Sequence, residues 1–304
     1  MSDFVPHPSP KFTVAYWSIR GIGAPLRMMA FYSKVPVKIV QYDGKMNPEN
    51  GIEDRSAWFD KKKSMKLVNP FINLPYIIDH EREGDMAGEG DKRCQDLIVS
   101  QSNACLSYLG RRLGLWPREG DYIDLAYCET FLAEVMDLRN QMVAFAYRGD
   151  KSFEKTKEDG LALLRNVQNK NGSLQKFELW FERKDLRATA PFLLDYCTAP
   201  DFHLIEILSQ YLVLLDWCGG QFGLLKTEFE QNFPKVNKFF VSFTQLPEME
   251  AYFKSDLHAG TPFNNKGARW GSIPARDLKY GESFAFSKGQ DYDWGKEEER
   301  IFNC

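Results

Sequence analysis

The chain has 304 residues, which at roughly 150 residues per domain suggests about two domains. Its 39 Lys and Arg residues nearly balance 42 Asp and Glu residues, so the formal charge is −3 and the pI is near 5.9. This balance provides no basic face for nucleic acid or for an anionic membrane surface. No apolar run approaches the roughly 20 residues of a membrane span, and the polar, proline-broken N-terminus does not resemble a signal peptide. We therefore expect a cytoplasmic protein.

The cysteines and histidines lack the spacings of a metal site or a redox pair. No two cysteines are separated by two residues, and the histidines are scattered. The pattern predicts free, mostly buried thiols in a reducing compartment and no bound metal. The cysteines are at positions 94, 105, 128, 197, 218 and 304, and the histidines at 7, 80, 203 and 258.

Strands and helices alternate in the first third of the chain. Gly21 and Gly23 follow a β-branched, aromatic segment, and Pro25 is suited to the first turn of a helix. The order predicts a small mixed sheet with helices packed on it. The predicted strands are 12–17, 37–42, 76–79 and 97–99, and the predicted helices are 25–33, 55–65 and 102–113.

After a linker at 113–120 the pattern becomes helical. Phe131, Val135, Leu138, Met142 and Phe145 form an apolar stripe at helical spacing. A second helix is expected from residue 152, with a break at 169–172. Residues 198–201, Thr-Ala-Pro-Asp, have the form of a capping box before an apolar helix over 202–217, and the polar tail after residue 271 is expected to pack only in part. The chain thus reads as an α/β domain followed by a helical one.

Several motifs, in this order and spacing, make the sequence specific. Tyr-Trp-Ser-Ile-Arg-Gly ends the first strand at 16–21, Asn-Leu-Pro-Tyr opens another at 73–76, and Gln-Ser-Asn-Ala starts a helix at 101–104. Arg-Ser-Ala-Trp at 55–58 and Val-Met-Asp-Leu-Arg at 135–139 belong to the same set. Together they closely resemble a cytosolic glutathione transferase, most similar to the mu class, over about residues 12–270.

The resemblance implies an α/β thioredoxin-like N-terminal domain at 11–112, an all-α C-terminal helical bundle domain at 121–270 and a tail at 271–304. It also implies glutathione as co-substrate, with no separate cofactor. Leu74–Pro75 would be a cis peptide bond, because cis bonds are almost confined to X–Pro and cluster in tight functional turns.

Tyr16 would be the catalytic residue, acting on the thiol of glutathione. A free thiol has a pKa of about 8.5, and one hydrogen bond to a charged acceptor contributes roughly 1.5–3 kcal/mol. The Tyr16 hydroxyl would therefore lower the thiol pKa by roughly one to two units. Because the thiolate is the nucleophile, this raises the reactive fraction at neutral pH severalfold. Ser18 is the rival hydroxyl, since other transferase classes use a serine near this turn.

The other glutathione-binding residues follow from the same resemblance. Leu74 would pair its backbone with the cysteinyl unit, while Gln101 and Ser102 at a helix start would bind the γ-glutamyl carboxylate. Lys62 would face the glycyl carboxylate, and Asp137 would reach the glutathione amine of the other subunit. The remaining residues of this predicted set are Trp17, Ile22, Arg55, Trp58, Asn73 and Pro75.

The electrophile site is predicted to be apolar with few polar anchors, as small-molecule pockets usually are. Tyr147 would donate to a developing oxyanion there. Ile22, Met136, Arg139 and Val143 would line the rest.

A homodimer is also implied. Phe71 corresponds to the aromatic residue that some transferase classes insert into the partner subunit, with core burial as the alternative. One departure is Ser107, where the mu pattern has an arginine, although Arg111 is retained. Two more are a longer excursion at 80–96, expected as an exposed hairpin, and a lengthened helical domain at 167–184.

We interpret the chain as an enzyme that adds glutathione to small hydrophobic electrophiles, with a role in detoxification. A carrier or structural protein of the same family, without turnover, is one alternative. A glutathione-dependent isomerase on the same scaffold is another.

Overall fold

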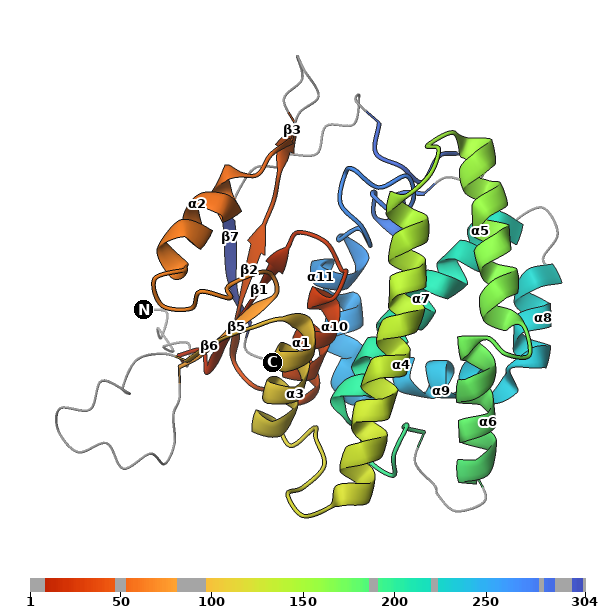
Figure 1. Cartoon of the computed structure of the whole chain (residues 1–304), viewed down its shortest axis with the longest axis horizontal. Helices are drawn as coiled ribbons and strands as arrows, with labels where there is room; N and C mark the ends of the chain where they lie inside the picture. The colour runs from red at the N-terminus through yellow and green to blue at the C-terminus, as the bar shows by residue number, and fades with distance from the viewer. Residues whose placement is uncertain are drawn as a thin grey trace, which may run out of the picture.

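The computed structural model describes residues 9–46, 53–80, 97–185, 191–219, 224–278, 282–287 and 297–302. Within them, one mixed β-sheet is joined to a bundle of helices (Figure 1). The excursion at 81–96 and the residues Cys94, Cys304 and His7 lie outside the described ranges.

The sheet has the strand order β6-β5-β1-β2-β7. β1 and β2 run parallel, while β5, β6 and β7 are antiparallel to their neighbours. The strands are β1 (Phe12–Trp17), β2 (Val37–Tyr42), β5 (Tyr76–Asp79), β6 (Leu97–Ser100) and β7 (Glu297–Phe302), and a separate two-stranded pair contains β3 (Lys45–Met46) and β4 (Glu53–Asp54).

Both faces of the sheet are covered by helices. Side chains alternate across a strand, so Val14 packs on the side of α1 (Gly23–Tyr32) and α3 (Ser102–Arg112). Ala15 faces the opposite side, where it packs with Trp58 of α2 (Ser56–Met65). This is the thioredoxin-like arrangement that the sequence predicts.

α1 begins two residues before Pro25, the predicted start. The N–H of Ala24 already donates to the carbonyl of Arg20, 2.9 Å away. Pro25 is still accommodated in the first turn, where the backbone N–H groups have no partner within the helix.

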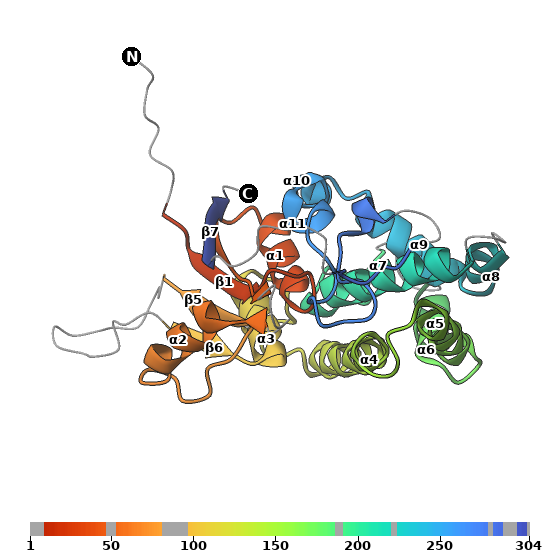
Figure 2. The same ribbon diagram turned by 90° about the horizontal axis from the view of Figure 1, so that it is seen from above.

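The helical part is centred on α7 (Ala199–Gly219), which packs against α1, α4 and α5 and is buried along most of its length (Figure 2). Its start confirms the predicted cap, because the Asp201 carboxylate accepts from both the N–H and the hydroxyl of Thr198 at 2.8 Å. The predicted break at 169–172 separates α5 from α6. The remaining helices are α4 (Tyr122–Tyr147), α5 (Phe153–Gln168), α6 (Ser173–Asp185), α8 (Leu224–Asn232), α9 (Pro234–Thr244), α10 (Glu250–Lys254) and α11 (Asp256–Ala259), with short 3-10 turns η2 (Pro247–Met249) and η3 (Ala275–Asp277).

The polar tail packs more extensively than its sequence predicts. Ile273 and Phe284 are buried in the core. The chain then returns to the N-terminal sheet, where β7 pairs with β2 over six residues and Phe302 lies 5.3 Å from the ring of Phe31 (Figure 2). The C-terminal segment therefore ties the two parts of the molecule together.

None of the helices in the described ranges is long and apolar enough to cross a membrane. The four cysteines within these ranges, Cys105, Cys128, Cys197 and Cys218, are free and buried, as predicted.

Candidate active site

Tyr16 lies at the end of β1, where the strand leads into the turn before α1. Its side chain is buried, and its ring packs closely against the backbone of the turn. A β-carbon added to Gly21 would lie 2.8 Å from the ring, and one added to Gly23 would lie 2.6 Å from it. Gly21 has a φ of +40°. The two glycines in the Tyr16 turn therefore leave the space that the tyrosine ring occupies.

A small cavity of about 140 Å³ adjoins Tyr16 between the sheet and α4. It brings together several residues that the sequence predicts at the site: Tyr16, Trp17, Arg139, Val143 and Tyr147. Ser18 is not among the residues that line it. The backbone N–H of Ser18 donates to the carbonyl of Tyr42 at 2.7 Å.

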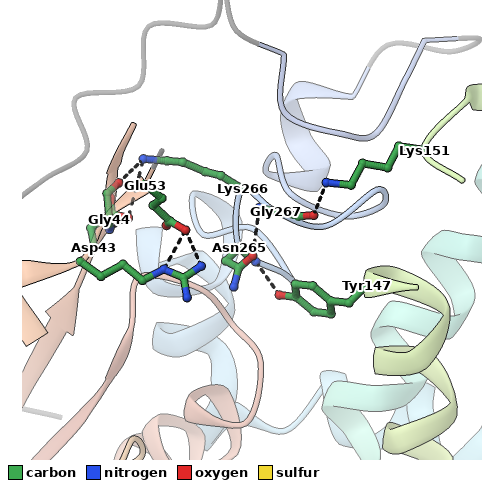
Figure 3. A network of polar contacts seen from close by, with 9 residues as sticks. Asp43, Gly44, Glu53, Tyr147, Lys151, Asn265, Lys266 and Gly267 are labelled. Carbon is green, nitrogen blue, oxygen red and sulfur yellow. Dashed lines mark hydrogen bonds and ion pairs between the residues drawn. The ribbon is translucent and has the colours of Figure 1, made fainter. Parts of the chain in front are cut away.

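The Tyr147 side chain lines this cavity. Its hydroxyl points to the backbone of Asn265 (Figure 3). The hydroxyl oxygen accepts a hydrogen bond of 2.8 Å from the backbone N–H of Asn265. Burial raises the pKa of Tyr147 to about 12, so the phenol remains protonated at neutral pH. Its proton is therefore available for donation to an acceptor in the cavity.

The sequence does not predict the polar residues that complete the lining. Gln210 comes from α7, and Asn264 and Asn265 come from the segment after α11. No local motif identifies them, because only the tertiary fold brings these segments to Tyr16. The predicted apolar character of the electrophile site is therefore only partly correct.

Two of the predicted lining residues lie elsewhere. Ile22 is buried in the core just before α1, and Met136 packs against the same core from α4. Neither lines the cavity.

Arg55 and Trp17 continue the site beyond the end of β2. Arg55 makes two hydrogen bonds to the Glu53 carboxylate, and its guanidinium carbon lies 5.6 Å from the centre of the Trp17 ring. Arg55 thus holds the segment between β4 and α2 against the first strand.

Lys62 and Trp58 lie together on α2. The Lys62 ammonium is 5.7 Å from the Trp58 ring and donates to the side-chain oxygen of Asn73 at 3.2 Å. Trp58 itself is buried between Tyr42 and Tyr76. The structure therefore brings Lys62 to the loop that precedes the proline.

That loop contains the predicted cis peptide bond, Leu74–Pro75. Ser100 at the end of β6 accepts from the N–H of Asn73 at 2.8 Å and lies within hydrogen-bond distance of its carbonyl. Among the described residues, no hydrogen bond engages the backbone of Leu74. Its N–H and carbonyl are thus free to pair with an extended ligand.

Gln101 and Ser102 follow Ser100 directly. Gln101 is exposed and has a φ of +77°, a conformation that a non-glycine residue adopts only at a cost of roughly 1–3 kcal/mol. Ser102 is the first residue of α3, whose initial N–H groups lack partners within the helix. Strained backbone clusters at active and ligand-binding sites, and the free N–H groups of a helix start favour an anion.

Asp137 and Phe71 do not line the Tyr16 cavity. Asp137 is exposed on α4 in a separate polar depression with Glu134 and Gln141. Phe71 is 80% exposed, so the alternative of core burial is wrong for this residue. Among the described residues, no cluster of His, Cys, Asp and Glu could hold a metal ion.

A mixed sheet with a cis-proline, joined to a helical bundle across a tyrosine-lined cavity, defines a thioredoxin-like protein with a second, helical domain. Solved structures share this fold. That of the glutathione S-transferase Blo t 8 has a TM-score of 0.61 at 23% identity and covers 85% of this chain and 99% of its own. That of the Onchocerca volvulus Pi-class glutathione S-transferase has a TM-score of 0.58 at 22% identity, over the same share of each chain.

Curated sequences give the family. Glutathione S-transferase Mu 1 of Mus musculus is 30% identical over 258 residues, which are 84% of this chain and 97% of that relative. Glutathione S-transferase Mu 1 of Oryctolagus cuniculus is 29% identical over 262 residues, 86% and 99% of the two chains. No protein-family model matches the chain. The chain belongs to the glutathione transferase family.

Proposed function

We propose that this protein is an active glutathione transferase of the mu type, which joins the sulfur of glutathione to small electrophiles. The observation that carries the proposal is the cavity in which Tyr16 and Tyr147 meet. Tyr16 would stabilise the thiolate after its proton has gone to solvent. As the sulfur bonds to the electrophilic carbon, a π bond at that carbon breaks and its electron pair moves toward an oxygen, to which Tyr147 donates a hydrogen bond.

The register brings Tyr16, Pro75 and Gln101 to the same end of the adjacent strands β1, β5 and β6, and we assign the predicted glutathione residues accordingly. Leu74 would pair with the cysteinyl unit, because its backbone is free of other hydrogen bonds. Gln101 and Ser102 would hold the γ-glutamyl carboxylate at the start of α3. Lys62 would bind the glycyl carboxylate, with Trp58 beside it.

The decisive experiment is a titration of the glutathione thiol bound to the protein, followed by absorbance near 240 nm. We expect the bound thiol to titrate roughly one to two pH units below free glutathione, and Tyr16→Phe to remove this difference. Conjugation of 1-chloro-2,4-dinitrobenzene should fall by a factor of roughly 10 to 100 in the same variant.

Tyr127→Phe is the matched control. Tyr127 is exposed on α4 and lies outside the Tyr16 cavity, so its loss should leave both measurements unchanged. A bound thiol that keeps its solution pKa in the wild-type protein would rule out the catalytic proposal. Binding of glutathione without turnover would instead favour the carrier alternative.

We also propose that the protein is a cytoplasmic homodimer. Free, buried cysteines suit a reducing compartment.

The proposed dimer is supported by an apolar surface. Leu67, Val68 and Phe71 form an exposed apolar surface after α2, and such surfaces mark protein contacts. Sedimentation should show twice the 35.2 kDa mass of one chain, and Phe71→Asp should shift it toward the single chain. A wild-type protein that sediments as a monomer at micromolar concentration contradicts the dimer.

A further inference from the structure

Arg139 is a cation without an acidic partner in the electrophile site. It lines the Tyr16 cavity, and no Asp or Glu is among the lining residues. No hydrogen bond or ion pair engages its guanidinium anywhere in the part of the chain that the structure describes. The cavity therefore has a net positive lining with an unused, fork-shaped donor.

The buried arginines near the cavity differ from Arg139. Arg20 is held by two hydrogen bonds to the Glu206 carboxylate, the shorter being 2.7 Å. Arg269 pairs with Asp159 at 2.7 Å, and Arg27 donates to two backbone carbonyls. Since a partly buried cation gains most from a paired carboxylate, an unpaired one beside a ligand cavity suggests that the ligand supplies the anion.

The order of three side chains along α4 places the anion at one end of the cavity, beside Arg139. Arg139, Val143 and Tyr147 are four residues apart and share one face of the helix, over about 12 Å of its axis. The guanidinium is at one end of this row and the phenol at the other, with an apolar side chain between them. A compact ring packed on Val143 would reach both.

In the described part of the chain, the opposite wall carries amide side chains and no cation. The side-chain amide of Gln210 donates to Glu206 at 2.9 Å, and that of Asn264 donates to the carbonyl of Trp270 at 3.1 Å. One N–H group of each amide is thus used within the protein. Among the described residues that line the cavity, Arg139 is the only cation.

We infer that the electrophile carries a carboxylate, bound by Arg139 while the reacting carbon faces Tyr16. This inference rests on the proposed function and specifies its substrate class. It also modifies the sequence-based expectation of a purely hydrophobic electrophile, because a neutral, apolar molecule would leave Arg139 unpaired.

The test uses two probes of the same shape, 4-chloro-3,5-dinitrobenzoate and 4-chloro-3,5-dinitrobenzamide. In each reaction the thiolate sulfur forms a C–S bond at the carbon bearing chlorine, and the C–Cl bond breaks as chloride leaves with the electron pair. Dividing kcat/KM for the carboxylate by kcat/KM for the amide cancels effects common to both. After correction for the uncatalysed rates, we expect this ratio to exceed one in the wild-type protein.

Arg139→Gln should lower the ratio by about 10-fold, the effect of losing one charge-assisted hydrogen bond. Arg139→Lys should give a ratio between those of the wild type and Arg139→Gln, because lysine keeps the positive charge but lacks the paired N–H groups of the guanidinium. Arg148→Gln is the matched control, since Arg148 is exposed at the end of the same helix and outside the cavity. It should leave the ratio at its wild-type value.

A ratio that is unchanged in Arg139→Gln overturns the inference. So does an equal loss on both probes accompanied by a higher thiol pKa, because Arg139 would then serve glutathione itself. If neither probe is turned over, the proposed function fails, and calorimetry with the two preformed glutathione conjugates decides the inference. Tighter binding of the carboxylate conjugate, lost in Arg139→Gln, supports it, and equal binding of the two conjugates rejects it.

Discussion

At the scale of single residues, the position of Tyr16 depends on the absence of side chains beside it. Gly23 has an ordinary helical backbone, so its role is not one of conformational freedom. A methyl group there would lie 2.6–2.8 Å from three atoms of Tyr16, distances that real contacts essentially never show. The tyrosine ring and the β-carbon of an alanine cannot occupy this space together.

Gly23→Ala should therefore displace Tyr16. We expect conjugation to fall toward the level of Tyr16→Phe and the bound thiol pKa to rise, while the folded state is destabilised by about 1–3 kcal/mol through overpacking. Thiol titration and denaturant unfolding measure the two effects.

Gly120→Ala separates site damage from general loss of stability. Gly120 has a φ of +92°, so an alanine there is strained, but nothing lies within 4 Å of the added carbon. This variant should lose stability and keep its thiol pKa. A Gly23→Ala protein with the wild-type thiol pKa would show that the ring position is not decisive.

At the scale of elements, a buried ion pair joins the Tyr16 turn to α7. The side chains of Arg20 and Glu206 are 6% and 0% exposed, and Gln210 extends the chain of hydrogen bonds into the cavity. The backbone N–H of Arg20 also donates to Pro262, so the turn is held from two sides. This network fixes the sheet domain relative to the helical bundle at the active site.

Glu206→Gln should destabilise the protein by about 3–5 kcal/mol, because it leaves the Arg20 charge buried without its counterion. Denaturant unfolding measures this loss. The double variant Arg20→Met/Glu206→Leu should be more stable than the single variant, since it removes both charges. A double variant that is less stable than Glu206→Gln would mean that the Arg20–Glu206 pair stabilises the folded protein by more than the desolvation of its two charges costs.

The sequence predicts the elements that depend on local interactions, but it misses those that depend on contacts between distant segments. Strands such as β1 and helices such as α4 follow from local periodicity, and the cis bond at Leu74–Pro75 follows from family resemblance. β7 does not, because its sequence Glu-Glu-Glu-Arg-Ile-Phe has the composition of an exposed tail. It becomes a strand only because β2 offers an unpaired edge and Phe302 can pack on Phe31.

The site divides in the same way. Tyr16, Arg139 and Tyr147 are predicted together and lie together. Asn264 and Asn265 carry no local signal, because their place is set by distant contacts. One of these is the hydrogen bond from Arg269 to the Phe145 carbonyl, which anchors the same segment to α4.

At the scale of the whole molecule, the segment after α11 bridges the two domains over the active site. Asn265 contacts Tyr147 of the bundle, while the Lys266 ammonium donates to the carbonyl of Gly44 at 2.6 Å (Figure 3). Asp43, 3.9 Å from the same ammonium, and Glu53 are the acidic groups nearby. Electrostatics at this contact therefore couples the C-terminal segment to the end of β2.

Burial has the largest effect on the pKa values of Asp43 and Lys266 at this contact. It raises the pKa of Asp43 from 3.8 to about 7, against the attraction of Lys266, and lowers the pKa of Lys266 from 10.5 to about 8. Between pH 4 and 7 the folded protein keeps a proton on Asp43 that the unfolded chain has lost. The contribution of Asp43 to stability is thus present below pH 4 and is lost as the pH rises through 7.

Asp43→Asn should remove this dependence. We expect the unfolding free energy of the wild type, minus that of the variant, to fall between pH 4 and 7 by at most about 4 kcal/mol, at 1.36 kcal/mol per pKa unit. Denaturant unfolding at pH 4.5, 6 and 7.5 measures the difference. Asp60→Asn, an exposed site on α2 outside this contact, is the matched control. A wild-type-minus-variant difference that stays constant or grows over this range would mean that Asp43 is ionised in the folded protein, with Lys266 rather than burial controlling the bridge.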